Sequence, residues 1–215
     1  LLYLTGDKSI KLEDIKNFRQ LNSICAGHPE YEKNSGIETT TGPLGQGIAN
    51  AVGMALAEKI LAHLLNSKKT NVIDHFTYCF LGDGCLMEGI SHEAMSFAGV
   101  HKLKKLICFY DSNGISIDGE ISDWYKDDIS LRCKAYGWNV INNIDGHNRE
   151  EIDEAISVAK KSKKPTMIVC KTHIGYGAGN KQDSESSHGA ALGSEIVAEL
   201  RENLDWPYSE FEIPH

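Results

Sequence analysis

Two residues that could ligate a metal ion follow two apolar stretches of the chain. Asp83 lies in a Gly-Asp-Gly turn directly after the apolar run 75–81, and Asn113 lies just beyond the apolar run 105–110. In open parallel sheets the carboxyl ends of the strands line the ligand crevice, so we expect Asp83 and Asn113 to meet there. Carboxylate and amide oxygens suit Mg²⁺ or Ca²⁺ that also holds phosphates, and a glycine turn before a helix suits a phosphate group. The spacing therefore predicts a site for a diphosphate and a metal ion.

Each of these motifs also has a simpler interpretation. Asn113-Gly114 is a common turn dipeptide, and Glu88 could be an ordinary carboxylate at a helix N-terminus. His28 and His188 lie in loops flanked by Gly or Pro, where a lone histidine is often only a surface residue. The Gly-rich loop 42–47 matches neither the dinucleotide fingerprint nor a P-loop. By residue type alone, the sequence indicates a ligand class but no reaction.

The elements that must position these residues alternate along the chain. Apolar runs predict strands over 75–81, 105–110, 138–144 and 165–170, and helical patterns fill 88–99, 127–136 and 148–161. Such alternation indicates an α/β protein with a parallel sheet covered by helices on both faces. The loop 175–192 is unusually long for a compact domain, which favours a functional role.

Three further helices are expected outside this alternation. They cover residues 11–21, 48–66 and 193–203. The apolar positions that we expect to face inward are Leu12, Ile15, Phe18 and Leu21 in the first, Ile48, Val52, Leu56 and Ile60 in the second, and Ile196, Val197 and Leu200 in the third.

Composition narrows the function classes. The net charge is −8 over 215 residues, and no block of Lys and Arg is dense enough to follow a nucleic-acid backbone. No apolar stretch approaches the ~20 residues of a membrane span. The six cysteines form no Cys-x-x-Cys pair, which fits a reducing compartment; we expect a cytoplasmic protein, or a plastid one whose leader has been removed. The chain starts inside an apolar run without Met, so we expect it to be part of a longer one.

Four segments of the chain resemble the N-terminal, diphosphate-binding domain of the transketolase family. They are Gly27–Glu30, the string Glu38-Thr-Thr-Thr-Gly-Pro-Leu-Gly-Gln-Gly47, Gly82–Ser91 and Asn113–Gly119. The resemblance covers essentially all of residues 1–215. It implies a thiamine-diphosphate-binding fold, with 175–192 as an active-site loop.

The resemblance also implies roles for individual residues. Asp83, Asn113 and the carbonyl of Ile115 would ligate Mg²⁺, for which Ca²⁺ or Mn²⁺ can substitute, with Asp111 in support. The residues that would contact thiamine diphosphate are Gly42, Leu44, Gly84, Glu88, Asn113, Ile117, Ile174 and His188. His28 and His188 would flank the reacting centre and bind the sugar substrate. Glu88 and Glu93 would belong to a carboxylate network at a subunit interface.

The activity that the resemblance implies is transfer of a two-carbon ketol unit. The donor would be a ketose phosphate such as xylulose 5-phosphate, and the acceptor an aldose phosphate such as ribose 5-phosphate or erythrose 4-phosphate, in the pentose phosphate pathway. The working enzyme would be a homodimer, and this chain alone would carry half of the site and be inactive. Dihydroxyacetone synthase or another ketol-transfer relative is one alternative, and a non-catalytic cofactor-binding module is another.

Two positions depart from the family pattern. The family has a proline where this chain has Ala191, in the string His188-Gly189-Ala190-Ala191-Leu192-Gly193. Losing a proline frees the loop in the unfolded state by about 0.4–1 kcal/mol. His173, just before Ile174, is also unusual for the family.

Overall fold

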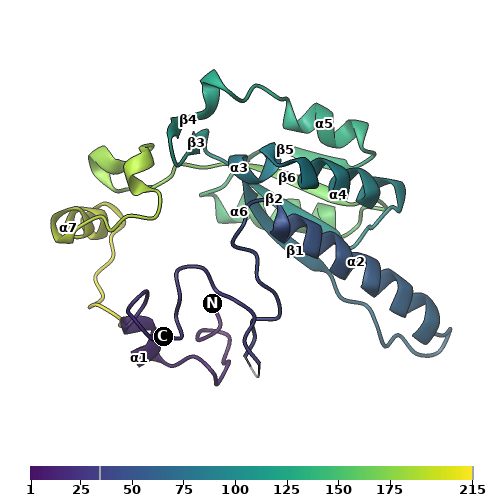
Figure 1. Ribbon diagram of the computed structural model, residues 1–215, viewed down its shortest axis with the longest axis horizontal. Helices are drawn as coiled ribbons and strands as arrows, with labels where there is room; N and C mark the ends of the chain where they lie inside the picture. Colours follow the sequence, from purple (N-terminus) through teal and green to yellow (C-terminus); the bar gives the residue numbers. More distant parts are fainter. Residues whose placement is uncertain (34, 215) are drawn as a thin grey trace.

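A sheet of four parallel strands lies at the centre of the computed structural model, which describes residues 1–33 and 35–214 (Figure 1). In spatial order the strands are β1 (Thr77–Gly82), β2 (Leu106–Ser112), β6 (Thr166–Lys171) and β5 (Asn139–Asp145). Each strand is parallel to its neighbours. The four strands expected from the apolar runs are therefore confirmed.

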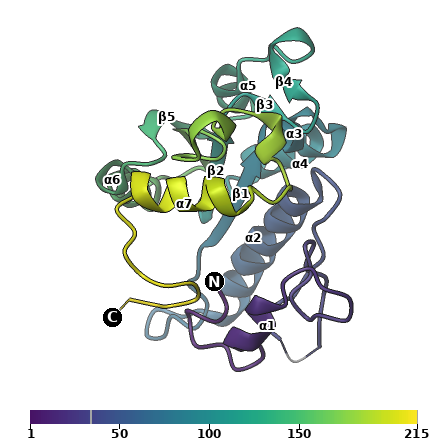
Figure 2. The ribbon, with the colours of Figure 1, turned by 90° about the vertical axis from the view of Figure 1, so that its left-hand side faces the viewer.

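Helices cover both faces of this sheet. On one face α2 (Gln46–Leu65), α4 (Gly89–Val100) and α5 (Ile129–Ala135) enclose a core with the inward side chains of the strands, and α2 and α4 lie side by side in both ribbon views (Figures 1 and 2). On the other face α6 (Arg149–Ala159) packs over Ile107, Phe109 and Ile168. Residues Leu106–Tyr110 are all buried, as expected for a parallel strand covered on both sides. The predicted α/β class is confirmed.

Two of the helices begin at side chains that cap them. The Asn148 side-chain oxygen accepts hydrogen bonds from the backbone N–H of Glu150 (3.0 Å) and Glu151 (3.2 Å), and Asp128 accepts one from Leu131 (2.8 Å). Such caps satisfy amides that have no partner within the helix. The sequence therefore specifies where α6 and α5 start.

Helix α4 packs closely on the turn between α5 and β5. A Cβ atom at Gly99 would lie 1.7 Å from the carbonyl oxygen of Tyr136, so only glycine fits there. The indole N–H of Trp138 donates a hydrogen bond of 2.8 Å to the carbonyl of Met95. These contacts fix α4, and with it the segment that precedes α4, relative to the sheet.

Several short elements were not predicted from periodicity because they are too short to show any. A five-residue helix, α3 (Asp83–Met87), comes between β1 and α4, and Glu88 separates the two helices with an extended backbone. The strands β3 (Ile115–Ser116) and β4 (Gly119–Glu120) form a small antiparallel hairpin. Three 3-10 turns follow at η1 (Ile121–Asp123), η2 (Gly179–Lys181) and η3 (Glu185–Ser187).

Parts of the expected helical faces are wrong. Helix α1 (Leu12–Lys16) ends well before residue 21, and both Phe18 and Leu21 are exposed. In α2 the inward stripe holds for Ile48 and Val52, whereas Ile60 is exposed; in α7 (Ser194–Asn203) Val197 is exposed. A period of four residues drifts around a helix of 3.6 residues per turn, so Ile60, the last member of the stripe in α2, leaves the buried face.

Helix α2 is also long and apolar enough, by length and composition, to cross a membrane, although no such stretch was expected from the sequence. In the structure one side of α2 packs against α4 and β1. That side includes Glu58, which is buried and paired with Lys105 at 2.9 Å. The rest of the helix is largely uncovered, since 28% of its apolar window is buried.

Candidate functional site

The site is built where β1 and β2 end. The strands are in register at Gly82 and Asp111, so the residues that follow them start side by side. Asp83 is the first residue of α3 and is 3% exposed. Its Oδ2 accepts a hydrogen bond of 3.1 Å from the backbone N–H of Gly114, and its Oδ1 accepts one from the Tyr110 hydroxyl. The structure thus places Asp83 against the turn that contains Asn113, as the spacing predicted.

The Asp83 carboxylate is buried without a positive partner. No ion pair to it occurs within residues 1–33 and 35–214. Burial raises the pKa of Asp83 above its ordinary value of 3.8, and the nearby Asp111 charge adds to this, whereas the hydrogen bonds from Tyr110 and Gly114 act in the opposite direction. Burial also raises the pKa of the Tyr110 phenol, which keeps it a hydrogen-bond donor. A carboxylate in such a place is stabilised by a cation.

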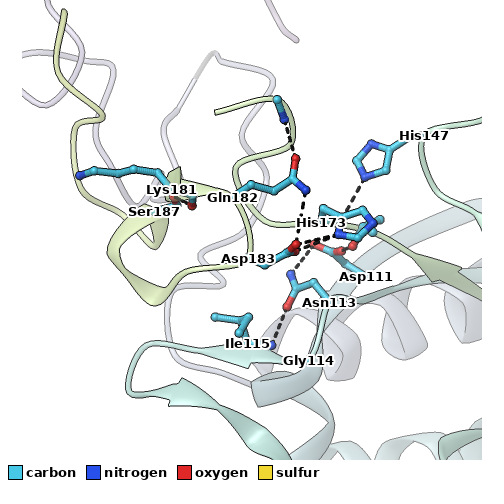
Figure 3. A network of polar contacts seen from close by, with 12 residues as sticks. Asp111, Asn113, Gly114, Ile115, His147, His173, Lys181, Gln182, Asp183 and Ser187 are labelled. Atoms are coloured by element: carbon cyan, nitrogen blue, oxygen red, sulfur yellow. Dashed lines mark hydrogen bonds and ion pairs between the residues drawn. The ribbon is translucent and has the colours of Figure 1, made fainter. Parts of the chain in front are cut away.

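Asn113 and Asp111 are held by hydrogen bonds around the same turn (Figure 3). Asn113 Oδ1 accepts from the Ile115 N–H at 2.9 Å, and Asn113 Nδ2 lies 3.5 Å from Asp111 Oδ2. The second carboxylate oxygen of Asp111 accepts a hydrogen bond from the Thr172 hydroxyl. Gly114 has φ +71, a left-handed conformation that glycine adopts without strain. Asp111 therefore contacts both Asn113, which follows β2, and Thr172, which follows β6.

A hollow of ≈ 400 Å³ opens beside this turn. The residues that line it are Asn113, Gly114, Ile115, Glu120, Ile121, Ser122, Thr172, His173 and Asp183. Asp83 lies behind Gly114 rather than in the wall. The lining carries acidic side chains and backbone groups, so it suits a ligand that arrives with a cation.

A second group of predicted residues lies next to Asp83. Leu44 lies over Gly84: its Cδ1 is 3.0 Å from the position that a Cβ atom at residue 84 would take. His28 lies beside Gly42, with its Cβ 3.9 Å from the corresponding position. The loop 42–47 is thereby held against the turn at the end of β1, and it presents Leu44, 53% exposed, to solvent.

Comparison with known proteins decides the family. The model of the transketolase thiamine diphosphate binding domain matches residues 1–215. The chain belongs to this family. Transketolase 1 of Escherichia coli (strain K12) is 55% identical over 215 residues, which cover 100% of this chain and 32% of that protein. Transketolase 1 of Vibrio vulnificus (strain YJ016) is 58% identical over 214 residues, again 100% of this chain and 32% of that protein.

Solved structures of transketolases share the fold. The enzyme from Leishmania mexicana has a TM-score of 0.94 at 44% identity, over 99% of this chain and 32% of its own. That from Campylobacter jejuni has a TM-score of 0.89 at 49% identity, over 95% of this chain and 32% of its own. The chain thus spans about a third of the length of the relatives that it matches.

Other residues that the transketolase resemblance singled out lie outside the Asp83 turn itself. Ile117 is 67% exposed in the turn between β3 and β4. Ile174 follows β6, and its carbonyl accepts a hydrogen bond from the Asp183 N–H. His188, Glu88 and Glu93 are exposed, and Glu88 packs against the loop 42–47, where its Cβ is 2.9 Å from a Cβ atom built at Gly45. Within the described residues no hydrogen bond joins these residues to the Asp83 turn, so their roles stay predictions.

Four residues at this site of the transketolase-family domain were not expected from the sequence. Tyr110 and Thr172 donate to the two aspartates, and His173 pairs with Asp183 at 2.9 Å. Strand alternation could have pointed to Tyr110. Neighbouring residues on a strand face opposite sides of the sheet, so Tyr110 faces the interior where the exposed Asp111 faces away from it. Nothing in the spacing of His173 and Asp183 predicts that they meet.

Proposed function

We propose that this chain is the diphosphate-binding domain of a transketolase. In the complete protein it would serve transfer of a two-carbon ketol unit from a ketose phosphate such as xylulose 5-phosphate to an aldose phosphate such as ribose 5-phosphate or erythrose 4-phosphate. The observation that carries the proposal is the buried Asp83 carboxylate facing the Asn113–Ile115 turn at the carboxyl ends of two parallel strands. The family match supplies the cofactor class, thiamine diphosphate.

A divalent ion, Mg²⁺ or in its place Ca²⁺ or Mn²⁺, fits the residues present. Each Asp83 oxygen accepts one protein hydrogen bond, and a carboxylate offers about four acceptor positions, so two remain for an ion. Asn113 and the Ile115 carbonyl would add neutral oxygens. The described residues hold no group of three or more His, Cys, Asp or Glu side chains suited to a metal. A site that takes amide, carbonyl and phosphate oxygens needs no such group.

The cofactor supplies the carbon-centred chemistry when bound, and the residues of this chain would hold and shield it. The Gly84 amide, near the N-terminus of α3, would face the diphosphate. Gly42, Leu44, Ile117 and Ile174 would contact its two rings and exclude water. His28 lies beside Gly42, from where it would donate hydrogen bonds to sugar hydroxyls. His188 would do so from the loop 175–192.

The complete enzyme would be a homodimer whose partner closes the site. Apolar side chains remain exposed on the two helices next to it: Met54 on α2, and Phe97 and Val100 on α4, the last 73% exposed. Exposed apolar side chains on adjacent elements are typical of an interaction surface. Glu88 and Glu93, which are exposed near the start of α4, would lie at this interface.

An activity assay on the complete polypeptide tests the proposal. With xylulose 5-phosphate and ribose 5-phosphate we expect turnover that requires both thiamine diphosphate and a divalent ion. The isolated domain should show none, because it carries half of the site. Cofactor binding without turnover in the complete polypeptide would favour a non-catalytic binding module. Turnover with formaldehyde as the better acceptor would favour a dihydroxyacetone synthase.

A further inference from the structure

Asp183 in the loop 175–192 binds the segment that leaves the end of β6 (Figure 3). His173 lies just after β6, and its Nδ1 is 2.9 and 3.0 Å from the two carboxylate oxygens of Asp183. The backbone N–H of Asp183 also donates a hydrogen bond of 2.9 Å to the Ile174 carbonyl. Side chain and backbone of the same loop residue thus bind neighbouring residues of the segment that leaves the sheet.

The backbone of Asp183 is in a left-handed conformation, with φ +57. Side chains other than glycine adopt this region rarely, although aspartate tolerates it better than most. Such conformations persist where surrounding contacts determine them. A glycine would take the same φ without strain, so the backbone at this position is less stable with aspartate than with glycine. The carboxylate, which a glycine would lack, is the group that contacts His173.

A second contact fixes His173 and the start of the loop. The backbone N–H of His173 donates a hydrogen bond of 3.0 Å to Nε2 of His147. The His147 ring stacks on Tyr176, with ring centroids 3.9 Å apart and planes inclined by 16°. Within the loop, the Gln182 side-chain oxygen accepts from the Gly177 N–H at 2.9 Å. His173 is therefore held from its backbone while its ring holds Asp183.

The pair stands at the candidate site without forming part of the Asp83 turn. His173 and Asp183 line the hollow together with Asn113 and Ile115. Ile174 directly precedes the loop, and His188 lies within it, five residues after Asp183. Both are predicted to contact the cofactor. The pair is accordingly placed to set where these two residues lie.

We propose that His173 and Asp183 are a positioning pair. The pair holds residues 174–188, from Ile174 to His188, in the arrangement that binds the ligand. This inference rests on the proposed function, because the ligand is the thiamine diphosphate and sugar of that site. Neither residue touches the reacting atoms; they act through Ile174 and His188. If the loop is correctly placed in a smaller fraction of molecules, apparent affinities fall by that fraction. Bound ligand holds the loop itself, so the rate at saturation stays the same.

Two variants of the complete polypeptide each delete one partner of the pair. His173→Ala deletes the ring, and Asp183→Gly deletes the carboxylate while relieving the left-handed backbone. His173→Asn is the conservative rescue, because its amide N–H can take the place of Nδ1–H. Asp205→Gly is the matched control: Asp205 is also exposed, acidic and left-handed, with φ +50, and it follows α7.

Both side chains of the pair are about half-exposed, which sets the size of the expected effect. We expect His173→Ala and Asp183→Gly to raise the KM for xylulose 5-phosphate and the Kd for thiamine diphosphate by about two- to fivefold, the size of effect measured for pairs of solvent-exposed side chains. The kcat at saturation should not change. Amide hydrogen exchange over 175–188, measured without ligand, should become faster. His173→Asn and Asp205→Gly should behave like the unmodified chain.

Different failures have different meanings. Unchanged exchange over 175–188 in both disruptive variants, or a fall in kcat with KM unchanged, overturns the positioning pair. An unmodified complete chain that binds no thiamine diphosphate overturns the proposed function, and with it the role of the pair in binding. If His173→Ala does not fold, Asp183→Gly still decides the question, because it removes the carboxylate from an exposed loop position without adding strain to the backbone.

Discussion

The Tyr110 hydroxyl donates a hydrogen bond to the Asp83 carboxylate inside the protein, at the point where β2 and α3 meet. Tyr110 belongs to the core under α2 and α4, whereas Asp83 faces the turn that lines the hollow. One hydrogen bond therefore couples the packed interior to the predicted metal ligand. Groups that orient a ligand in this way tune the affinity of the site.

Tyr110→Phe should weaken the site while keeping the ring in the core. We expect Mg²⁺ affinity to fall by about tenfold, because Asp83 loses a group that orients it. The free energy of unfolding should fall by about 1–3 kcal/mol, since a buried carboxylate loses a donor. Titration calorimetry and thermal unfolding measure the two effects. Tyr78→Phe, at a half-exposed tyrosine of β1, is the control and should change neither.

The pH dependence of stability should differ between the unmodified chain and Asp83→Asn in the absence of divalent ions. The pKa of Asp83 is raised in the folded state, so the fold binds the proton of this carboxyl more tightly than the unfolded chain does. Its contribution to stability is then lost as the pH rises from 3.8 through the folded pKa. Unfolding in urea across this range should show Asp83→Asn gaining stability relative to the unmodified chain as the pH increases. A constant difference would contradict the assigned environment.

Two glycine substitutions test the packing that holds α4. Gly99→Ala should destabilise the fold by about 1–3 kcal/mol, because the new Cβ would overlap the Tyr136 carbonyl. Gly53 lies in α2 with nothing within 4 Å of its Cβ position. Gly53→Ala should therefore leave stability unchanged or raise it by about 0.5–1 kcal/mol. Equal effects of the two changes on the thermal midpoint would show that the close approach at Gly99 is wrong.

His28→Ala should separate substrate binding from cofactor binding. Because His28 lies beside Gly42 and not at the Asp83 turn, we expect a raised KM for the donor sugar with thiamine diphosphate affinity nearly intact. Steady-state kinetics and a cofactor titration measure the two quantities. An equal loss of both would exclude a specific contact with the sugar. His63→Ala, at an exposed histidine near the end of α2, serves as the control.

The sheet was predictable from sequence because its strands are continuous apolar runs. Strands buried on both faces carry a strong local signal, and β2 is such a strand. The meeting of Asp83 with the Asn113 turn followed from a topological rule about strand ends. By contrast, the exposure of Leu21 and Ile60 could not be read from the sequence, since a helical period is the same whether or not something covers it.

Contacts between distant loops were the least predictable part of the site. Tyr110 carried a recoverable signal in strand alternation. The pairing of His173 with Asp183 depends on the path of the loop 175–192, which no periodicity describes. The short helix α3, five residues long, has too few positions to show a helical period. Such features arise from tertiary structure and have no counterpart in a local pattern.

The central claim is that Asp83 anchors a diphosphate through a divalent ion, and one titration tests it most directly. Thiamine diphosphate is titrated, with Mg²⁺ present, into the complete polypeptide carrying Asp83→Ala. As a control, Asp153→Ala removes an exposed acidic residue on α6. We predict that Asp83→Ala lowers cofactor affinity by about 100-fold or more, because it removes a ligand rather than a supporting group, whereas Asp153→Ala changes nothing. Unchanged affinity in a folded Asp83→Ala protein would contradict the account.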